Sequence, residues 1–396
     1  MTDIPPTQRR SLPTGVWALG FVSLFMDISS ETVHGLLPVF LVSALGASVT
    51  QVGVLEGFAE ATALVMKVFS GPLSDWMNRR KPLVVLGYTM GALSKPLFAL
   101  AQGVALVYGA RIFDRIGKGI RGAPRDALVA DFTPPELRGR AYGLRQSLDT
   151  VGAFIGPILA VVLMILTQGD FRAVFWIATV PAMIAVAILL IWIREPEKRQ
   201  AGSREKFSLN DLGHFGPAFW LVVGAGALFQ LARFSEAFLI LRARNFGLSL
   251  DMAPSVLVVM NIVYAMTAYP VGHLSDRVGR TWFLVLGLAV LFSADLVLGL
   301  SHGLFGVFVG IGLWGLHMGL TQGILAALVV DHCDARVRGT AFGLFNLFSA
   351  ISLMVASTMA GILWDQFGAS TTFLAGAVLA LLSLLAFGVN WRVLRV

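Results

Sequence analysis

Ionisable side chains inside apolar segments offer the clearest chemistry in this sequence. One apolar segment, residues 104–129, carries seven charged residues that a helical spacing of 100° per residue places within about 140° of arc: Arg111, Asp114, Arg115, Lys118, Arg121, Arg125 and Asp126. Charges inside a bilayer are costly, face the interior of a helix bundle and commonly mark a pathway. The first five of these residues are therefore candidates for lining a substrate pathway.

Acidic residues in the two first apolar segments are candidates for carrying protons. Asp27, Glu31 and His34 share one helical face in the first segment, and Glu56 and Glu60 lie one turn apart in the second. Two carboxyls one turn apart are costly to ionise together, so one of them should bind a proton near neutral pH. That property is what coupling to a proton gradient requires.

Depth in the membrane suggests partners for the acids of the first segment. Asp27 lies about mid-membrane and Glu31 further outward, at a depth similar to that of Arg111 and Arg115. We therefore expect the two acids to pair with the two arginines. Such pairs would form either a working proton relay or a static network that only locks the helices together.

Polar residues are unevenly shared between the halves of the chain. The first half adds Arg145 and Asp149, one turn apart. The apolar segments of the second half carry few polar residues, and the candidates for substrate contact there are Arg233, Glu236, Asn261, His317 and Asn346. Taken singly, each also fits a role in helix packing. The asymmetry predicts that the first half performs coupling and charge recognition, while the second provides a largely apolar wall.

The composition restricts the elements that can hold these residues. Of the 396 residues, 56% are apolar and only 13% are charged, whereas soluble proteins carry about 25% charged residues. A water-soluble fold and a disordered chain are both excluded. The net charge of +7 fits the cytoplasmic loops of a membrane protein better than a nucleic-acid surface. The single cysteine, Cys333, excludes a cysteine metal cluster, and we expect no metal and no cofactor.

Twelve segments reach the ~20 mostly apolar residues that a membrane-spanning helix needs. They lie at roughly 15–42, 50–76, 83–101, 104–129, 140–166, 172–193, 217–242, 252–275, 281–300, 304–330, 339–364 and 370–390. Alternating strands of ~10 residues are absent from the sequence, so a β-barrel is not expected. The predicted fold is all-helical, with twelve transmembrane helices.

The distribution of Lys and Arg orients these spans. With the N-terminus in the cytoplasm, the inner segments carry 18 Lys and Arg and the outer loops carry 3, Arg172, Arg242 and Arg244. The positive-inside rule therefore places both termini in the cytoplasm. We expect a cytoplasmic tail (1–14), a six-helix bundle (15–193), a charged cytoplasmic linker (194–216) and a second six-helix bundle (217–396).

An internal repeat relates the two halves at an offset of about 200 residues. Gly-xxx-Asp occurs at 71–75 and again at 272–276, and Arg-Gly-x-Ala occurs at 138–141 and again at 338–341. A repeated acid beside basic residues at a helix end can latch neighbouring helices in one state and release them in another. The residues expected to form such cytoplasmic gates are Gly71, Asp75, Arg79, Arg80, Asp131, Arg138, Gly272, Asp276, Arg280, Asp331 and Arg338.

The loop Gly71-xxx-Asp75-xx-Asn78-Arg79-Arg80-Lys81 resembles the G-xxx-D-xx-G-R-R/K signature of the major facilitator superfamily (MFS), and Gly272-xxx-Asp276-xx-Gly279-Arg280 resembles its second copy. Asn78 stands where the family usually has Gly, a mild departure because Asn tolerates a left-handed backbone. The resemblance extends over all twelve spans. It implies two six-helix bundles that form pseudo-repeats.

Two further segments resemble family signatures. Arg111 matches the arginine that opens the fourth-helix signature, and the resemblance implies a part in proton transfer; Arg115 stands where the family usually has Gly. Gly152-xxx-Gly156-Pro157 resembles the fifth-helix signature of the family's drug/proton antiporters, although the Gly pair that usually follows the proline is missing. The fifth segment therefore favours export.

These observations predict a secondary active transporter that moves a small molecule across the inner or plasma membrane by alternating access. The sequence has no Walker A motif, so an ion gradient is the expected energy source, and the buried acids favour protons and efflux by antiport. The alternative substrate is a phosphorylated or carboxylated anion attracted by the basic stripe. A membrane-embedded enzyme and a receptor or channel are weaker readings. We expect a monomer in the lipid bilayer, with no nucleic-acid partner.

Overall fold

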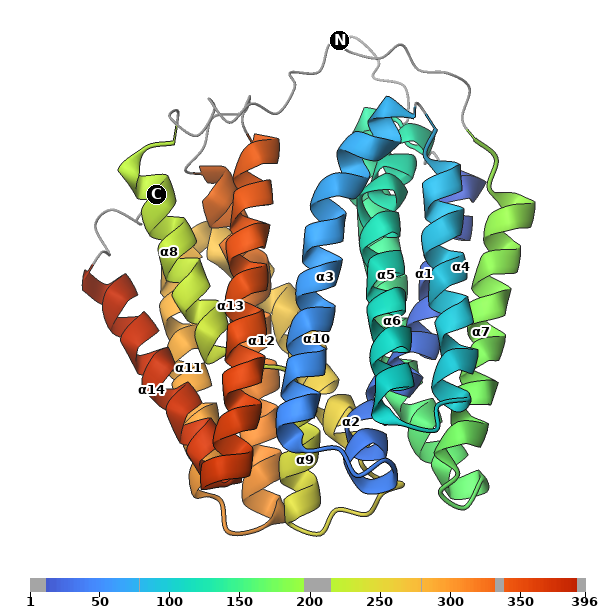
Figure 1. Ribbon diagram of the computed structural model, residues 1–396. Helices are drawn as coiled ribbons and strands as arrows, with labels where there is room; N and C mark the ends of the chain where they lie inside the picture. The colour runs from blue at the N-terminus through green and yellow to red at the C-terminus, as the bar shows by residue number, and fades with distance from the viewer. Residues whose placement is uncertain (1–11, 78, 196–214, 279, 332–337, 390–396) are drawn as a thin grey trace, which may run out of the picture.

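The structure is a computed structural model that describes residues 12–77, 79–195, 215–278, 280–331 and 338–389 (Figure 1). The described residues are helical, and no strand occurs among them. The first half contains α1 (Thr14–His34), α2 (Leu37–Val39), the π-helix η1 (Phe40–Ala44), α3 (Val49–Trp76), α4 (Lys81–Ala99), α5 (Val104–Phe132), the 3-10 helix η2 (Pro135–Leu137), α6 (Arg138–Leu166) and α7 (Phe171–Trp192). The second contains α8 (Pro217–Ala232), α9 (Ala237–Asn245), α10 (Ser255–Val278), α11 (Arg280–Leu300), α12 (Leu304–Asp331), α13 (Arg338–Phe367) and α14 (Ala369–Val389).

These elements correspond to the twelve predicted segments when α1, α2 and η1 count as one segment and α8 and α9 as another. Within the described residues, nine of the twelve are long and apolar enough to cross a membrane by length and composition alone. The three others are α3, α4 and α5, and α5 carries the charged stripe. The orientation stays a prediction, so we call the end where α3 begins and α13 ends the predicted outer end.

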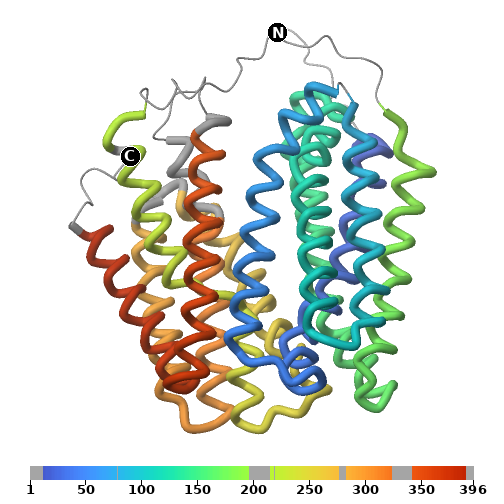
Figure 2. Tube along the Cα trace, in the orientation of Figure 1, coloured from blue at the N-terminus to red at the C-terminus, as the bar shows by residue number. Residues whose placement is uncertain are grey.

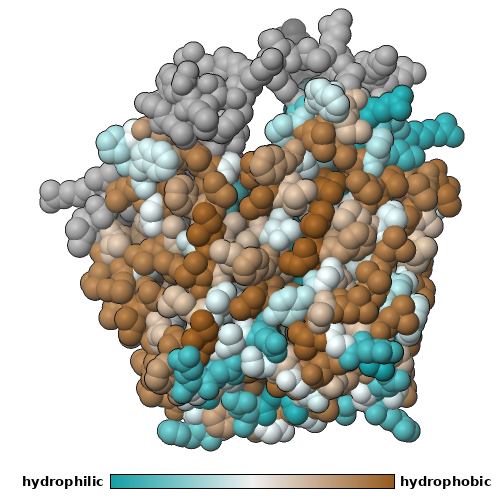
Figure 3. Space-filling model, viewed as in Figure 1, coloured by the Kyte–Doolittle hydropathy of each residue, from teal (hydrophilic) through white to brown (hydrophobic). Residues whose placement is uncertain are grey.

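The outer faces of the helices are apolar, as contact with lipid requires. Figure 3 shows an apolar surface over most of the visible face, with hydrophilic residues gathered toward its lower and upper edges. Large apolar side chains stand exposed along α6 and α7, including Leu166, Val180 and Ile191. In a soluble protein a patch of this size would mark a binding surface, and here it fits a chain surrounded by lipid.

The two halves meet along α3 and α13, which Figure 2 shows side by side. Glycines permit this close approach. A Cβ added at Gly57 would lie 2.8 Å from the carbonyl oxygen of Met354, and one added at Gly361 would lie 2.7 Å from Cα of Thr50. Small residues at these positions let two backbones pack directly against each other. A second contact between the halves joins α6 to α10.

Both first helices of the halves are interrupted at equivalent places. Helix α1 ends at His34 and α2 begins at Leu37, while α8 ends at Ala232 and α9 begins at Ala237. The repeat offset of 200 residues superposes the two breaks. The predicted spans 15–42 and 217–242 are therefore each interrupted once, although each remains one segment long and apolar enough to cross a membrane.

The break before α9 is held by specific hydrogen bonds. The backbone N–H of Ser235 donates to Oγ of Ser357 on α13 at 3.1 Å, and the N–H of Ala237 donates to Oγ of Ser235 at 3.2 Å. The Ser235 hydroxyl thus gives a partner to the first N–H group of α9, which has no acceptor within the helix. Paired interruptions of this kind in two repeats point to the region where a transporter binds its substrate.

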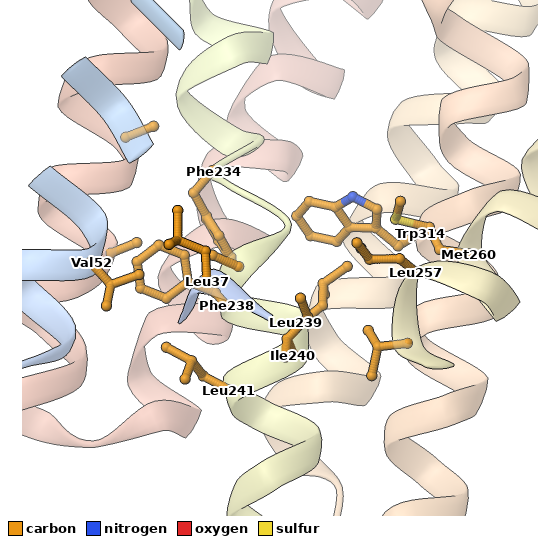
Figure 4. Close-up of a cluster of buried hydrophobic side chains, with 14 of the residues drawn as sticks. Leu37, Val52, Phe234, Phe238, Leu239, Ile240, Leu241, Leu257, Met260 and Trp314 are labelled. Atoms are coloured by element: carbon orange, nitrogen blue, oxygen red, sulfur yellow. The ribbon is translucent and has the colours of Figure 1, made fainter. Parts of the chain in front are cut away.

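An apolar cluster joins the halves beside these breaks. Figure 4 shows Leu37 and Val52 of the first half near Phe238 of α9. The ring of Phe238 packs edge-on against Phe234, with centroids 5.3 Å apart, and Phe234 in turn packs against Trp314. All of these side chains are buried. The cluster closes the space between the halves on the outer side of the breaks.

Candidate transport site

A cluster of deeply buried charges lies between α1, α3 and α5. The guanidinium Nη2 of Arg111 donates to Oε2 of Glu56 at 2.7 Å and lies 2.9 Å from Nδ1 of His34. Arg111 is 2% exposed and Glu56 is 1% exposed. The side chains of these three predicted site residues therefore neutralise and hold one another, and the geometry fits a structural lock between three helices.

One turn further along α5, a second group of ion pairs begins. Nη1 of Arg115 lies 3.1 Å from Oε1 of Glu60, and Nε of Arg115 lies 3.7 Å from Oδ2 of Asp114. Asp114 in turn accepts a hydrogen bond of 2.9 Å from Nζ of Lys95 on α4. Glu60 is the exception to deep burial in this group, since its side chain is 32% exposed. Lys95 was not among the predicted site residues.

Asp27 and Glu31 do not pair with the arginines of α5, so that expectation is wrong. Within the described residues neither carboxyl has a hydrogen bond or an ion pair, and both side chains are half-buried. The reason is competition, because Glu56 and Glu60 of α3 already occupy the guanidinium groups of Arg111 and Arg115. Two acids one turn apart thus make no direct ion pair within the described residues, and only longer-range interactions with bases reach them.

The glycines of α6 set the position of these two acids. A Cβ added at Gly152 would lie 3.0 Å from Cβ of Asp27, and one added at Gly156 would lie 2.6 Å from Cβ of Glu31. The hydroxyl of Thr32 also donates to the carbonyl oxygen of Gly156 at 3.0 Å. The Gly-xxx-Gly pattern is therefore a packing device that brings α6 directly against the acid-bearing helix.

Lys118 is the exposed member of the charged stripe. It has no ion pair within the described residues, and it interacts electrostatically with Glu60, Glu31 and Asp27. Glu236, from the second half, interacts electrostatically with Glu31, Glu60 and Lys118 as well. Charged groups from both halves therefore share one electrostatic environment.

The predicted cytoplasmic part of the stripe is also satisfied internally. The guanidinium of Arg121 lies over the ring of Tyr88, 4.4 Å from its centroid, an arrangement that stabilises a cation by the ring quadrupole. Nη1 of Arg145 lies 2.6 Å from Oδ2 of Asp149. Arg125 pairs with its neighbour Asp126 at 3.2 Å. Little free positive charge remains along α5.

The candidates of the second half are scattered. Nη2 of Arg233 lies 3.8 Å from Oε1 of Glu236, inside the break. Asn261 donates from Nδ2 to the carbonyl oxygen of Ala153 on α6 at 3.2 Å, which joins the halves. His317 is fully buried and packs edge-on against aromatic rings, and neither ring nitrogen has a hydrogen-bond partner within the described residues. Asn346 lies half-buried on α13.

The first predicted cytoplasmic gate forms around Arg80. Its Nη1 pairs with Asp131, its Nη2 lies 3.8 Å from Oδ1 of Asp75, and Nη1 also donates to the carbonyl oxygen of Ala127 at 2.8 Å. The arginine thus ties the end of α3 to the end of α5. Arg79 is exposed.

Other members of the predicted gates are less informative. Gly71 lies against Ala123 of α5, a Cβ added at Gly272 would meet open space, and Nε of Arg138 is buried without a hydrogen-bond partner within the described residues. The second gate lies outside the described side chains, which applies to Asp276, Arg280, Asp331 and Arg338.

Two charged residues near the predicted outer end were missed by the sequence reasoning. Asp365, at the end of α13, accepts hydrogen bonds from the backbone N–H groups of Val49 (3.2 Å) and Thr50 (2.7 Å), so one half caps the first turn of α3 in the other. Arg242, expected in an outer loop, lies within α9 and is 5% exposed. It donates to the carbonyl oxygen of Leu298 at 2.9 Å. No sequence signal distinguishes either residue from an ordinary loop charge.

The chain is similar to known proteins along most of its length. A family model described as the Major Facilitator Superfamily matches residues 19–242 and 222–395. The chain is 32% identical over 383 residues to an uncharacterized MFS-type transporter of Methanocaldococcus jannaschii, covering 94% of each. It is 25% identical over 377 residues to the multidrug resistance protein MdtH of Proteus mirabilis, covering 91% of this chain and 88% of that protein.

Solved structures share the fold. A POT family transporter in complex with 5-aminolevulinic acid superposes with a TM-score of 0.81 at 12% identity, covering 98% of this chain and 99% of that one. A bacterial homolog of the human lysosomal transporter Spinster, in an inward-facing and unoccupied conformation, superposes with a TM-score of 0.77 at 17% identity, covering 96% and 97%. The twelve segments, the repeat and the family match agree. The chain belongs to the Major Facilitator Superfamily of membrane transporters.

Proposed function

We propose that this protein is a proton-coupled antiporter that exports a small organic molecule by alternating access. The observation that carries the proposal is the pair Asp27 and Glu31, half-buried on α1 and without a direct ion pair within the described residues. Two such carboxyls one turn apart favour uptake of a proton by one of them. The similarity to a multidrug resistance protein supports efflux as the direction.

The five predicted coupling residues divide into three roles. Glu56 and His34 are held by Arg111 and serve as structure. Glu60 is partly exposed and pairs with Arg115, so protonation of Glu60 or arrival of a substrate would free the arginine. Asp27 and Glu31 are left as the candidates for proton coupling.

The alternative of an anionic substrate rests on Lys118. The other bases of the stripe are satisfied by acids or by an aromatic ring, so the stripe as a whole does not provide a strongly positive path. Lys118 is exposed and could bind a carboxylate or phosphate group. Asp27 and Glu31 nearby oppose such binding, and we therefore favour a substrate that is not a multivalent anion.

Alternating access requires a closed end that can open. Asp365 joins the halves at the predicted outer end, and its neighbour Trp364 packs against Phe238 of the apolar cluster, with ring centroids 5.8 Å apart. At the opposite end, the described contacts of Arg80 join helices of the same half and none of them reaches the other half. This distribution favours an inward-facing state, as in the Spinster homolog named above.

The test is transport by purified protein in proteoliposomes under an imposed pH gradient. Ethidium and tetraphenylphosphonium serve as cationic probes and benzoate as an anionic probe. We expect a gradient-driven flux of at least one probe in the wild type, and loss of the gradient response in Asp27→Asn or Glu31→Gln. Glu136→Gln, which neutralises an exposed acid of η2, is the control. A wild-type response in both α1 variants would contradict the proposal.

A further inference from the structure

One buried acid has no role in the site described above. Asp295 lies on α11 and is 0% exposed. Neither of its carboxyl oxygens has a hydrogen-bond partner within the described residues. Buried polar groups are nearly always satisfied, so an exception in the middle of a helix bundle calls for an explanation.

The repeat shows what stands at the same place in the first half. An offset of 200 residues relates Asp295 to Lys95 and Trp314 to Asp114, and Lys95 and Asp114 form a buried ion pair at 2.9 Å. Helix packing supports the equivalence. Gly87 lies against residue 121 between α4 and α5, and Gly287 lies against residue 321 between α11 and α12. The second half thus keeps a charge-bearing position but has lost the opposite charge.

The surroundings of Asp295 are apolar and belong to the break between α8 and α9. A Cβ added at Gly376 of α14 would lie 2.8 Å from Oδ2 of Asp295 and 2.9 Å from Cε1 of Phe234. Phe234 sits in the break and packs against Trp314, with ring centroids 5.4 Å apart. The indole N–H of Trp314 is also buried, with no hydrogen-bond partner in the part of the chain that the structure describes. Phe234 and the carboxyl of Asp295 therefore lie against the same glycine of α14.

Ionisable groups on the neighbouring elements make their described contacts elsewhere. Helix α14 has no Asp, Glu, Lys, Arg or His. Arg233 pairs with Glu236 inside the break, and the guanidinium of Arg242 bonds the carbonyl oxygen of Leu298. His317 of α12 packs between aromatic rings, and Tyr264 of α10 interacts with the Arg233 pair. The remaining titratable groups of α10 and α12 lie at the ends of these helices away from Asp295: Tyr269, His273, Asp276, Arg277 and Asp331.

A proton is the ligand that fits this environment. An ionised carboxylate here would have no counter-charge and no hydrogen bond, which costs more than the site gains. A divalent cation would need about six oxygen ligands, and no group of three or more potential metal ligands occurs among the described residues. The neutral acid makes no described hydrogen bond and so does not stabilise this conformation. We therefore expect it to act in a different conformation of the transport cycle.

We propose that Asp295 is a proton-binding site of the second half, which holds its proton in this conformation and releases it when the segment 233–236 moves Phe234 away. The site would couple the break between α8 and α9 to protonation, just as Asp27 and Glu31 act in the first half. This coupling role rests on the proposed antiport, whereas the bound proton does not.

Infrared spectroscopy of the purified protein tests the bound proton without any substrate. We expect a carbonyl band of a protonated carboxyl that persists from mildly acidic to mildly alkaline pH in the wild type and disappears in Asp295→Asn. Glu136→Gln should keep it. A band of equal intensity in Asp295→Asn, or a wild type without a persistent band, would overturn the proposal.

A second variant separates this role from a structural one. Asp295→Val replaces the carboxyl with an apolar side chain that is only slightly larger, and it should keep the thermal unfolding temperature of the wild type, because the neutral acid makes no hydrogen bond to lose; a marked fall would indicate a structural role. Release is tested with ethidium in proteoliposomes, where Asp295→Asn should reduce gradient-driven flux about tenfold and keep exchange at equal pH. If the infrared band is confirmed but Asp295→Asn leaves the gradient-driven flux unchanged, the proposed release of the proton during transport would be overturned. If only Asp27→Asn and Glu31→Gln depart from expectation and keep the wild-type gradient response, the result would contradict the proposed antiport but not the proton on Asp295.

Discussion

The two halves of this transporter share a backbone plan but differ in charge at equivalent positions. With the offset of 200 residues, Arg111 corresponds to Ile311, Lys118 to Met318 and Glu31 to Leu231. The first half fills the space between its helices with ion pairs, and the second fills it with apolar side chains. The fold therefore does not need the charges, because the second half packs without them. Their retention in the first half points to a role in transport.

The exceptions to this contrast are informative. In the second half, Arg233 and Glu236 sit in the break between α8 and α9, and Asp295 lies against the same glycine of α14 as Phe234, a residue of that break. Polar groups in the second half thus concentrate near one interrupted helix. The comparison predicts that replacing first-half charges by their second-half equivalents separates those that stabilise the fold from those that serve transport.

The largest effect is expected at the buried pair of Arg111 and Glu56. Glu56→Val, which installs the equivalent residue of the second half, leaves Arg111 buried without its carboxylate and should lower the free energy of unfolding by about 3–5 kcal/mol. The double variant Glu56→Val/Arg111→Ile should recover most of that loss, because both equivalents are apolar. Thermal unfolding in detergent measures both. A double variant as unstable as the single one would show that the halves are not interchangeable here.

A loss of coupling with little loss of stability is expected at Asp27 and Glu31. Asp27→Asn should reduce gradient-driven flux of ethidium about tenfold, roughly 1.4 kcal/mol in the coupled step, because the remaining acid has no like charge one turn away. Exchange at equal pH should persist, since the site still reorients when loaded. An unchanged gradient response would move the coupling site to Glu60 or to the second half.

Much of this arrangement could be predicted from the sequence. Hydropathy gave the number of spans, the repeat gave the equivalence of the halves, and helical spacing gave the charged face of α5. The pairing of Asp27 with Arg111 was wrong because helical spacing fixes a direction on one helix but not which neighbour is closest. In the structure it is Glu56 on α3 that pairs with Arg111. The cap at Asp365 and the hydrogen bonds of Ser235 depend on contacts between distant segments, which single-sequence patterns do not contain.

A smaller effect is expected at Lys118, where the second half has methionine. Lys118→Met should change the free energy of unfolding by no more than roughly 0.5 kcal/mol, as ordinary surface substitutions do. The reason is that the side chain is exposed and has no ion pair within the described residues. The apparent KM of the transported probe should change by a few fold. Complete loss of transport, together with binding of benzoate by the wild type, would instead favour the anionic substrate.

The smallest effect is expected at Asp365. The first half has no acid at the equivalent position, where residue 165 is isoleucine. Its carboxylate caps α3 from the other half, so Asp365→Asn removes the charge and weakens a contact that must break when the predicted outer end opens. A cap of this kind contributes about 1 kcal/mol, so the population should shift toward the outward-open state by roughly fivefold.

Cross-linking measures the shift: cysteines at Gln51 and Gln366, in a Cys333→Ser background, should link less in Asp365→Asn than in its parent. Asp251→Asn, in the loop before α10, serves as the matched control. Equal cross-linking in Asp365→Asn and its parent would show that the glycine contacts between α3 and α13 hold this end closed without the cap.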